Sequence, residues 1–210
     1  MPSVNPNDRL VGILGGTFDP VHCGHIALAE AGRDQLGLDR VYFVPAPLPP
    51  HKAGAPLAKA SERLEMVRLA IVGAPKLSVN ALEFERQGPS YSIDTVRAFR
   101  RMLGAEAELF FLIGADTIGE LPTWKEIGEL ARLCTFAAAG RQGWDAGDLG
   151  ALAGAIDEES IERMRRSTIR MSPIEVSSTE IRARVRRGES IEGLVPGAVA
   201  RYIAAQKLYR

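Results

Sequence analysis

The stretch that decides the fold of this chain reads Gly15-Gly16-Thr17-Phe18-Asp19-Pro20-Val21-His22-Cys23-Gly24-His25. An apolar run at 10–14 precedes it and predicts a buried strand, and residues 25–36 follow it with apolar side chains at helical spacing. A glycine-rich turn between a strand and a helix lets the backbone approach a phosphate, and the helix N-terminus offers unpaired N–H groups to that phosphate. The stretch lacks the Gly-Lys-Ser/Thr of a Walker loop and the Gly-x-Gly-x-x-Gly of a dinucleotide-binding fold. It therefore predicts a different phosphate site, at the carboxyl end of a strand in an α/β sheet.

Strand-like and helix-like segments alternate along the rest of the chain, which is typical of a parallel sheet with helices on both faces. We expect further strands at 41–44, 77–84, 109–113, 135–139 and 169–174, and helices at 61–72 (with Ser61 as N-cap), 92–103, 179–187 and 196–207. The Pro-rich segment 45–56 is expected to be a functional loop, and 140–156 a mobile segment. The pattern predicts one doubly wound, Rossmann-like domain over 1–210, with its core at about 10–175 and a small C-terminal helical segment at about 176–210.

The composition excludes several classes of protein. The chain has 210 residues with 26 basic and 26 acidic side chains, and this balance argues against a nucleic-acid binder. No apolar run approaches the roughly 20 residues of a membrane span, and the polar N-terminus lacks a signal-peptide pattern. The two cysteines, Cys23 and Cys134, are too few for a disulfide framework or a zinc ribbon. We therefore expect a soluble, cytoplasmic protein, although the balanced total hides eight arginines against three glutamates between 162 and 187.

His22 and His25 lie three positions apart at the start of the predicted helix, so both rings can face one pocket. Either ring could instead cap the helix or pack in the core. A metal site that includes Cys23 is disfavoured, because Cys23 would point about 100° away from His22 on a helix and no acidic partner is evident. Imidazoles on a phosphate turn can donate hydrogen bonds to phosphorus oxygens while negative charge develops during group transfer. The two histidines are therefore candidate catalytic residues, and no metal site built from protein ligands is predicted.

The stretch resembles the Gly-Gly-Thr-Phe-Asp-Pro-x-His-x-Gly-His motif of the nucleotidylyltransferase superfamily, and more closely that of bacterial nicotinate-nucleotide adenylyltransferases. Further matching stretches are Pro49-Pro50-His51-Lys52, Gly88–Thr95, Ile113–Asp116 with Leu121–Trp124, and Val176–Arg182, so that the resemblance spans almost the whole chain. Three positions depart from the family pattern. Ser92 stands where Thr is usual, Val176 where Ile is common, and Gly140-Arg141-Gln142-Gly143 where an Arg-Pro-Gly turn is frequent, which leaves Arg141 without an assigned role.

The resemblance implies a role for each matching residue. The residues implied for ATP are Gly15, Gly16, Thr17, Phe18, His22, His25, Gly114, Asp116, Ser177, Ser178, Thr179 and Arg182. Those implied for nicotinate mononucleotide are Gly16, Thr17, Asp19, Lys52, Tyr91, Ser92 and Trp124. His22, His25, Lys52 and Arg182 would act as catalytic residues, with Mg²⁺ accompanying ATP. Judged without the resemblance, the serines could equally be an ordinary N-cap, Lys52 a solvated side chain and Trp124 core packing.

The function that the resemblance implies is transfer of the adenylyl group of ATP to nicotinate mononucleotide, which gives nicotinate adenine dinucleotide and pyrophosphate in NAD biosynthesis. Two alternatives stay open: transfer to another phosphate such as phosphopantetheine, and a nucleotide sensor without catalysis. The stretch Leu121–Trp124 argues against the first, and the intact histidines argue against the second. We expect small-molecule substrates, with no nucleic-acid or membrane partner. The sequence leaves open whether the chain forms a homo-oligomer and whether nicotinate is preferred over nicotinamide.

Overall fold

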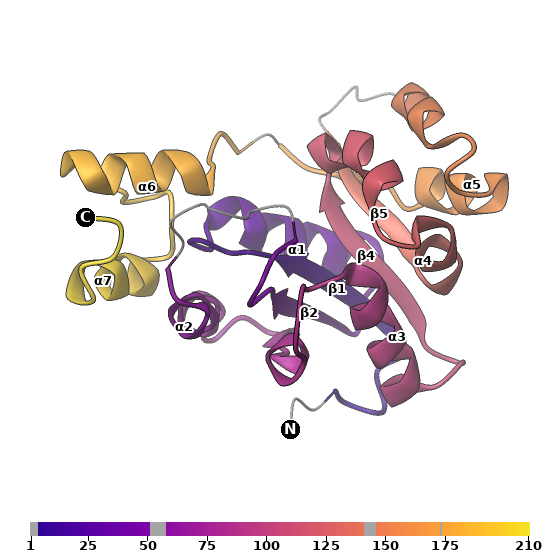
Figure 1. Ribbon diagram of the computed structural model, residues 1–210, viewed down its shortest axis with the longest axis horizontal. Coiled ribbons are helices and arrows are strands. Elements are labelled where there is room, and N and C mark those ends of the chain that lie inside the picture. Colours follow the sequence, from indigo (N-terminus) through magenta and orange to yellow (C-terminus); the bar gives the residue numbers. More distant parts are fainter. Residues whose placement is uncertain (1–3, 51–57, 141–145, 173) are drawn as a thin grey trace.

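A six-stranded sheet forms the centre of the computed structural model, which describes residues 4–50, 58–140, 146–172 and 174–210 (Figure 1). Its strands lie in the order β3-β2-β1-β4-β5-β6, and every pairing is parallel. The bounds are β1 (Leu10–Gly16), β2 (Arg40–Pro45), β3 (Leu77–Val79), β4 (Glu108–Gly114), β5 (Thr135–Gly140) and β6 (Ile169–Arg170). The strand order reverses between β1 and β4, and such a switch point is where doubly wound sheets bind ligands beyond the carboxyl ends of their strands.

Helices cover both faces of this sheet, so the predicted α/β class is confirmed (Figure 1). They are α1 (Cys23–Gln35), α2 (Ala60–Ala70), α3 (Ser92–Leu103), α4 (Ile127–Leu133), α5 (Glu158–Arg166), α6 (Ser178–Arg187) and α7 (Gly197–Ala205), with 3₁₀ turns η1 (Leu82–Glu85), η2 (Ala115–Thr123) and η3 (Ala146–Leu152). One hydrophobic core joins the sheet to α3, α4 and α5, and a second joins its other face to α1, α2, α6 and α7. Because strand side chains alternate, Ile13 belongs to the first core and Leu14 to the second.

Several predicted elements have different bounds. β3 ends at Val79, because the N–H of Asn80 makes the last bond to Phe43 O and the Asn80 side chain then accepts from Leu82 N at 3.0 Å, which turns the chain into η1. β6 is two residues long rather than six. α2 begins at Ala60, with Ser61 inside its first turn and Lys59 as N-cap.

Parts of the chain that looked irregular in the sequence are ordered. The segment 140–156, which was expected to be mobile, contains η3, whose Leu149 and Leu152 are buried in the core. The helices α4 and α5 were not predicted. Both are short, and a short amphipathic segment gives a weak periodic signal.

Candidate functional site

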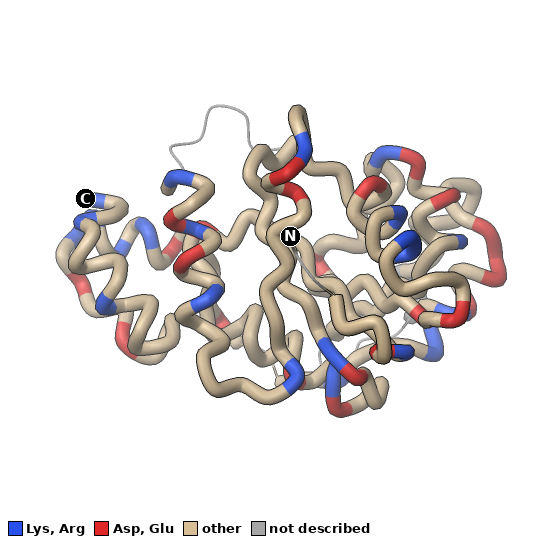
Figure 2. Tube along the Cα trace, turned by 90° about the horizontal axis from the view of Figure 1, so that it is seen from below, with Lys and Arg blue, Asp and Glu red and all other residues tan. Residues whose placement is uncertain are grey.

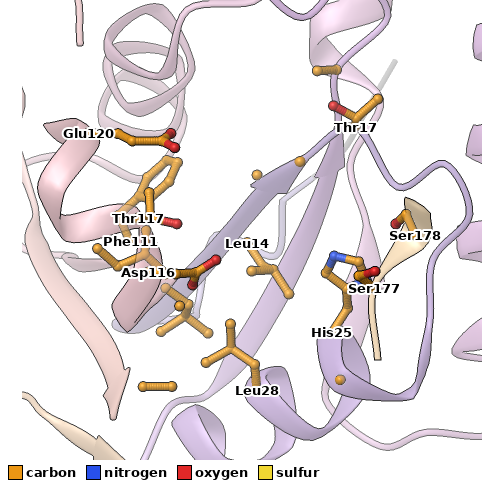
Figure 3. Close-up of a pocket in the computed structure, with 18 of the residues that line it drawn as sticks. Leu14, Thr17, His25, Leu28, Phe111, Asp116, Thr117, Glu120, Ser177 and Ser178 are labelled. Carbon is orange, nitrogen blue, oxygen red and sulfur yellow. The ribbon is translucent and has the colours of Figure 1, made fainter. Parts of the chain in front are cut away.

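A large open pocket, with a volume of about 1110 Å³, lies at the carboxyl ends of β1 and β4 (Figure 3). Thr17, His25, Ser177 and Ser178 lie on one side of it, and Asp116 and Glu120 lie on the other. The pocket therefore occupies the switch point of the sheet, where the sequence placed the phosphate site.

The floor of the pocket is backbone, because glycines end β1. A Cβ atom on Gly15 would lie 3.1 Å from Phe111 Cζ, and one on Gly16 would lie 3.2 Å from the ring of Phe18. Phe18 itself has φ +50° and is 2% exposed, and its ring does not line the pocket. It packs edge-on against the ring of His25 at a centroid distance of 5.0 Å. The role of Phe18 in the structure is thus to support the turn and His25 from the core side.

The two histidines form a stacked pair that lines the pocket. Their ring centroids are 3.7 Å apart, and the backbone N–H of His22 donates to His25 Nδ1 across 3.2 Å. Since Nδ1 of His25 accepts a hydrogen bond, the neutral ring carries its proton on Nε2. Burial lowers the pKa of His22 to about 4, so this ring is neutral near pH 7. The turn therefore presents a neutral His22 ring stacked on the ring of His25.

The N-terminus of α6 forms the wall next to His25. Ser177 is its N-cap and accepts from Glu180 N at 3.1 Å, while Ser178 Oγ donates to the carbonyl of Pro20 at 2.9 Å. Both serines and Thr179 line the pocket, and the free N–H groups of the first turn suit an anion. Helix capping and phosphate binding are therefore compatible roles for this segment.

An aromatic wall stands on the far side of the pocket, at the start of α3. Tyr91 is the N-cap of α3 and Ser92 its first residue, and both line the pocket together with Trp124. Trp124 is half-buried and packs edge-on against Phe111, with ring centroids 5.7 Å apart. Lys125 Nζ lies 4.5 Å from the centroid of the Tyr91 ring. Gly114 and Asp116 line the edge between this wall and the floor.

Three expected site residues are not brought to the pocket lining. Asp19 is 1% exposed, and its Oδ1 accepts from Ala58 N at 3.1 Å and from the hydroxyl of Tyr209 at 2.8 Å. Arg182 donates to the carbonyl of Asp19 at 2.7 Å and so lies behind the turn. Lys52 lies outside the described residues. Phe18, whose ring is buried in the core, is the third described residue that does not line the pocket, after Asp19 and Arg182.

A buried carboxyl group at the edge of the pocket, that of Glu83, was not predicted from the sequence. Glu83 is 6% exposed, accepts a hydrogen bond from Thr95 Oγ1, and lies 3.5 Å from Arg86 Nη2. Burial raises its pKa, with Asp94 acting in the same direction and Thr95, Ser90 and Arg86 acting against it. Glu83, Ser90 and Thr95 all line the pocket. Glu83 is followed three positions later by Arg86, but such a pair usually marks a solvated helix face.

A second missed residue is Arg63, whose guanidinium is 1% exposed. It donates to the carbonyls of Thr17, Ala46, Pro47 and Ala58, at distances of 2.6 to 3.1 Å. These bonds join the turn after β1, residues 15–25, to the loop after β2. We call residues 15–25 the phosphate turn, after the ligand that the sequence predicts for it. In the sequence Arg63 looks like a surface residue of a charged helix, so no local pattern marks it.

The basic segment of the sequence is largely compensated in the structure. Acidic and basic residues are interspersed along the chain (Figure 2). On α5, Glu162 pairs with Arg166 at 3.0 Å, and on α6, Glu180 pairs with Arg184 at 3.0 Å. Arg187 pairs with Glu189 at 2.6 Å. These arginines form a solvated, ion-paired surface. Arg182, on the same helix as Arg184, instead donates to the carbonyl of Asp19.

Within the described ranges, no group of three or more His, Cys, Asp or Glu side chains could hold a metal ion. Within the same ranges, no helix combines the length and apolar character needed to cross a membrane.

Comparison with known proteins identifies the family of this chain. The cytidylyltransferase-like family matches residues 13–184. A probable nicotinate-nucleotide adenylyltransferase of Moorella thermoacetica is 43% identical over 95% of this chain and 91% of its own length, and one of Bordetella petrii is 44% identical over 96% and 100%. The structure of Plasmodium falciparum nicotinic acid mononucleotide adenylyltransferase complexed with NaAD shares the fold, with a TM-score of 0.74, 18% identity, and coverage of 96% of this chain and 97% of that one. The resemblance noted in the sequence is confirmed: the chain is a nucleotidyltransferase that belongs to the cytidylyltransferase-like family and, within it, to the nicotinate-nucleotide adenylyltransferases.

Proposed function

We propose that this enzyme transfers the adenylyl group of ATP to the 5′-phosphate of nicotinate mononucleotide, giving nicotinate adenine dinucleotide and pyrophosphate. The observation that carries the proposal is one pocket in which the phosphate turn, the stacked histidines and the α6 N-terminus face an aromatic wall at the start of α3. This arrangement suits a triphosphate on one side and a pyridine mononucleotide on the other. Relatives at 43% and 44% identity, each named a probable nicotinate-nucleotide adenylyltransferase, support the same activity.

The phosphates of ATP bind along the turn and the N-terminus of α6 in this proposal. Gly15, Gly16 and Thr17 offer backbone and hydroxyl groups, and the segment Ser177–Thr179 offers a helix N-terminus. Gly114 and Asp116 hold the adenosine side, at the end of β4.

The acceptor mononucleotide binds against the aromatic wall. The nicotinate ring stacks on Trp124, and its carboxylate meets the hydroxyls and N–H groups at Tyr91 and Ser92, at the N-terminus of α3. Its 5′-phosphate shares Gly16 and Thr17 with ATP. Asp19, which is buried behind the turn, contributes to this site by holding Thr17 and its neighbours in place.

In the reaction an oxygen of the acceptor phosphate forms a bond to the α-phosphorus of ATP. The bond from that phosphorus to the oxygen that bridges the α- and β-phosphates breaks, and this oxygen leaves with pyrophosphate. No side chain forms a covalent bond, because the substrate phosphate is the nucleophile. Nε2 of His25 donates a hydrogen bond to the α-phosphate of the adenylyl group during transfer, and the neutral His22 ring holds His25 in position. Lys52 and Arg182 supply positive charge around the leaving group and the turn.

Mg²⁺ accompanies ATP in this proposal. It usually keeps several waters and is bound by substrate phosphates with one or two carboxylates, so it needs no dedicated cluster of protein ligands. Asp116 in the pocket offers such a carboxylate, and the described residues hold no larger cluster. The bound ion would neutralise charge on the triphosphate. We place the reaction in the cytoplasm, with small molecules as its only substrates.

The test is pyrophosphate release from ATP and Mg²⁺, with nicotinate mononucleotide, nicotinamide mononucleotide and phosphopantetheine supplied in turn. Release with nicotinate mononucleotide in preference to the others supports the proposal. Release mainly with phosphopantetheine would reassign the acceptor, and binding of ATP without release in any mixture would make the protein a nucleotide sensor.

A further inference from the structure

The C-terminal tail reaches the phosphate turn. Tyr209, the penultimate residue, donates its hydroxyl hydrogen to Asp19 Oδ1 at 2.8 Å, although the two residues are 190 positions apart. Tyr209 follows α7 with φ +64°. The C-terminus lies beside α6 and α7, at the end of the molecule where α2 also lies (Figure 1). The last residues of the chain are therefore part of the structure around the pocket.

The carboxylate of Asp19 contacts polar groups from three separate segments of the chain. Its side chain is fully buried, Oδ1 accepts from Ala58 N and Tyr209, and Oδ2 lies 3.7 Å from Arg182 Nη1. No hydrogen bond reaches Oδ2 from any described residue. A buried carboxylate depends on each donor it has, since an unpaired charge is costly to bury. Burial and the neighbouring Asp19 raise the pKa of Tyr209, so its hydroxyl remains a donor across the working range of pH.

The backbone around Asp19 is fixed from behind by the same region. Arg182 donates to the carbonyl of Asp19 at 2.7 Å, Ser178 to that of Pro20 at 2.9 Å, and Arg63 to that of Thr17 at 2.6 Å. Phe18, next to Asp19, has a left-handed φ of +50°. A non-glycine residue keeps such a backbone conformation only where its surroundings hold it there. The conformation of the turn thus depends on side chains that α2, α6 and the tail bring to it.

We infer that Tyr209 is a positioning residue for adenylyl transfer, which acts through Asp19 on the turn that carries Thr17 and His22. The inference rests on the proposed function. The hydroxyl of Tyr209 does not touch the substrates. It completes the hydrogen bonds of the buried Asp19 carboxylate, and that carboxylate keeps Thr17 correctly placed relative to His22 and His25. Small displacements of such a turn lower the rate because in-line attack requires close alignment.

The first experiment removes the hydroxyl group of Tyr209 and keeps its aromatic ring. Tyr209→Phe retains the packing of the side chain, and Tyr202→Phe on α7 is the matched control. We expect Tyr209→Phe to lower kcat about tenfold, the scale of one hydrogen bond to a charged group. KM for ATP should change little. The thermal unfolding midpoint should fall, because a buried carboxylate loses one of its donors, so kcat is measured well below that midpoint. Tyr202→Phe should keep wild-type kinetics. A fall in thermal stability with unchanged kcat would mean that Tyr209 only packs, and would overturn the inference.

A double-mutant cycle with Asp19→Asn tests whether Tyr209 acts through Asp19. We expect Tyr209→Phe to cost less than about twofold in kcat when Asp19 is already Asn, because coupled residues give non-additive effects. Additive losses would contradict the inference, and this comparison remains informative if one single variant is less stable. The two proposals fail differently. An inactive wild-type enzyme refutes the proposed function and the inference with it, whereas an active wild type with an equally active Tyr209→Phe refutes the inference alone.

Discussion

The imidazole rings of His22 and His25 stack with their centroids 3.7 Å apart, and the backbone N–H of His22 donates to His25 Nδ1 across 3.2 Å. The ring of Phe18 packs edge-on against His25 from the core side. Charging a buried ring beside another imidazole is unfavourable, and burial alone lowers the pKa of His22 to about 4. His22, which is neutral near pH 7, and Phe18 therefore fix the ring of His25 from two sides.

Removal of the His25 ring should affect catalysis more than binding. We expect His25→Ala to lower kcat about 10²- to 10³-fold, as loss of one transition-state donor does, with a much smaller change in KM for ATP. The measurement is steady-state pyrophosphate release with nicotinate mononucleotide. Cys23→Ser is the control, because Cys23 lies between the histidines but does not line the pocket. Near-normal turnover of His25→Ala would remove His25 from the catalytic residues.

Burial of His22 should make the stability of the protein depend on pH. Its pKa is about 4 in the folded protein and 6.5 ordinarily, so between these values the unfolded chain binds more protons. The contribution of His22 to the free energy of unfolding should therefore be fully present above pH 6.5. It should be lost as the pH drops towards 4, which lowers the free energy of unfolding by at most about 3 kcal/mol. Denaturant unfolding at several pH values measures it. His22→Gln should show a shallower dependence in that window, and an equal slope in both proteins would contradict this origin.

A single methyl group at Gly24 should disturb the histidine pair. A Cβ atom there would lie 3.1 Å from both His22 Nδ1 and Val176 Cγ1, so the His22 ring must shift. We expect Gly24→Ala to lower kcat by about tenfold or more, because transfer is sensitive to displacements below 1 Å. Gly150→Ala is the matched control, since a Cβ atom at Gly150 meets nothing within 4 Å. Unchanged kinetics in Gly24→Ala would mean that the position of the His22 ring does not matter for transfer.

Local sequence signals predicted the parts of the site that depend on local structure. Glycines after an apolar run placed the turn at the end of β1, and helical spacing gave α3 its observed bounds of Ser92–Leu103. Both signals lie within a dozen residues of sequence, and they do not depend on distant contacts. The sequence also left an N-cap role open for the serines before the predicted helix at 179–187, and Ser177 is the N-cap of α6.

The residues that were missed or misplaced depend on distant parts of the chain. Arg63 is buried only because the turn and the loop after β2 present carbonyls to it. Asp19 points away from the pocket because Ala58 and Tyr209 meet it on the other side. Glu83 is buried because α3 places Thr95 against it. No periodicity marks these positions, since tertiary packing decides which charged side chains are enclosed.

The buried carboxyl group of Glu83 should produce the opposite pH dependence to His22. Its pKa is raised in the folded protein, so the folded state keeps a proton that the unfolded chain loses above its ordinary pKa of 4.5. This group therefore favours the folded state most at low pH, and its contribution is lost as the pH rises through the raised pKa. We expect Glu83→Gln to be more stable relative to wild type at pH 8 than at pH 4.5. Thermal unfolding at both pH values measures the difference, and Glu85→Gln on the same turn is the control. Equal differences at the two pH values would contradict the burial effect.

Trp124 should determine the affinity for the acceptor and leave ATP binding nearly unchanged. Its ring lines the pocket on the side of Tyr91 and is fixed edge-on by Phe111, so one face is available for stacking on a pyridine ring. We expect Trp124→Ala to raise KM for nicotinate mononucleotide about two- to tenfold, the range of one aromatic contact, and Trp124→Phe to raise it less. KM for ATP serves as the internal control, because we propose that the ATP phosphates bind across the pocket, at the turn and α6. Equal increases of both KM values would indicate that the substitution distorts the whole pocket, and an unchanged KM for the mononucleotide would place its ring elsewhere.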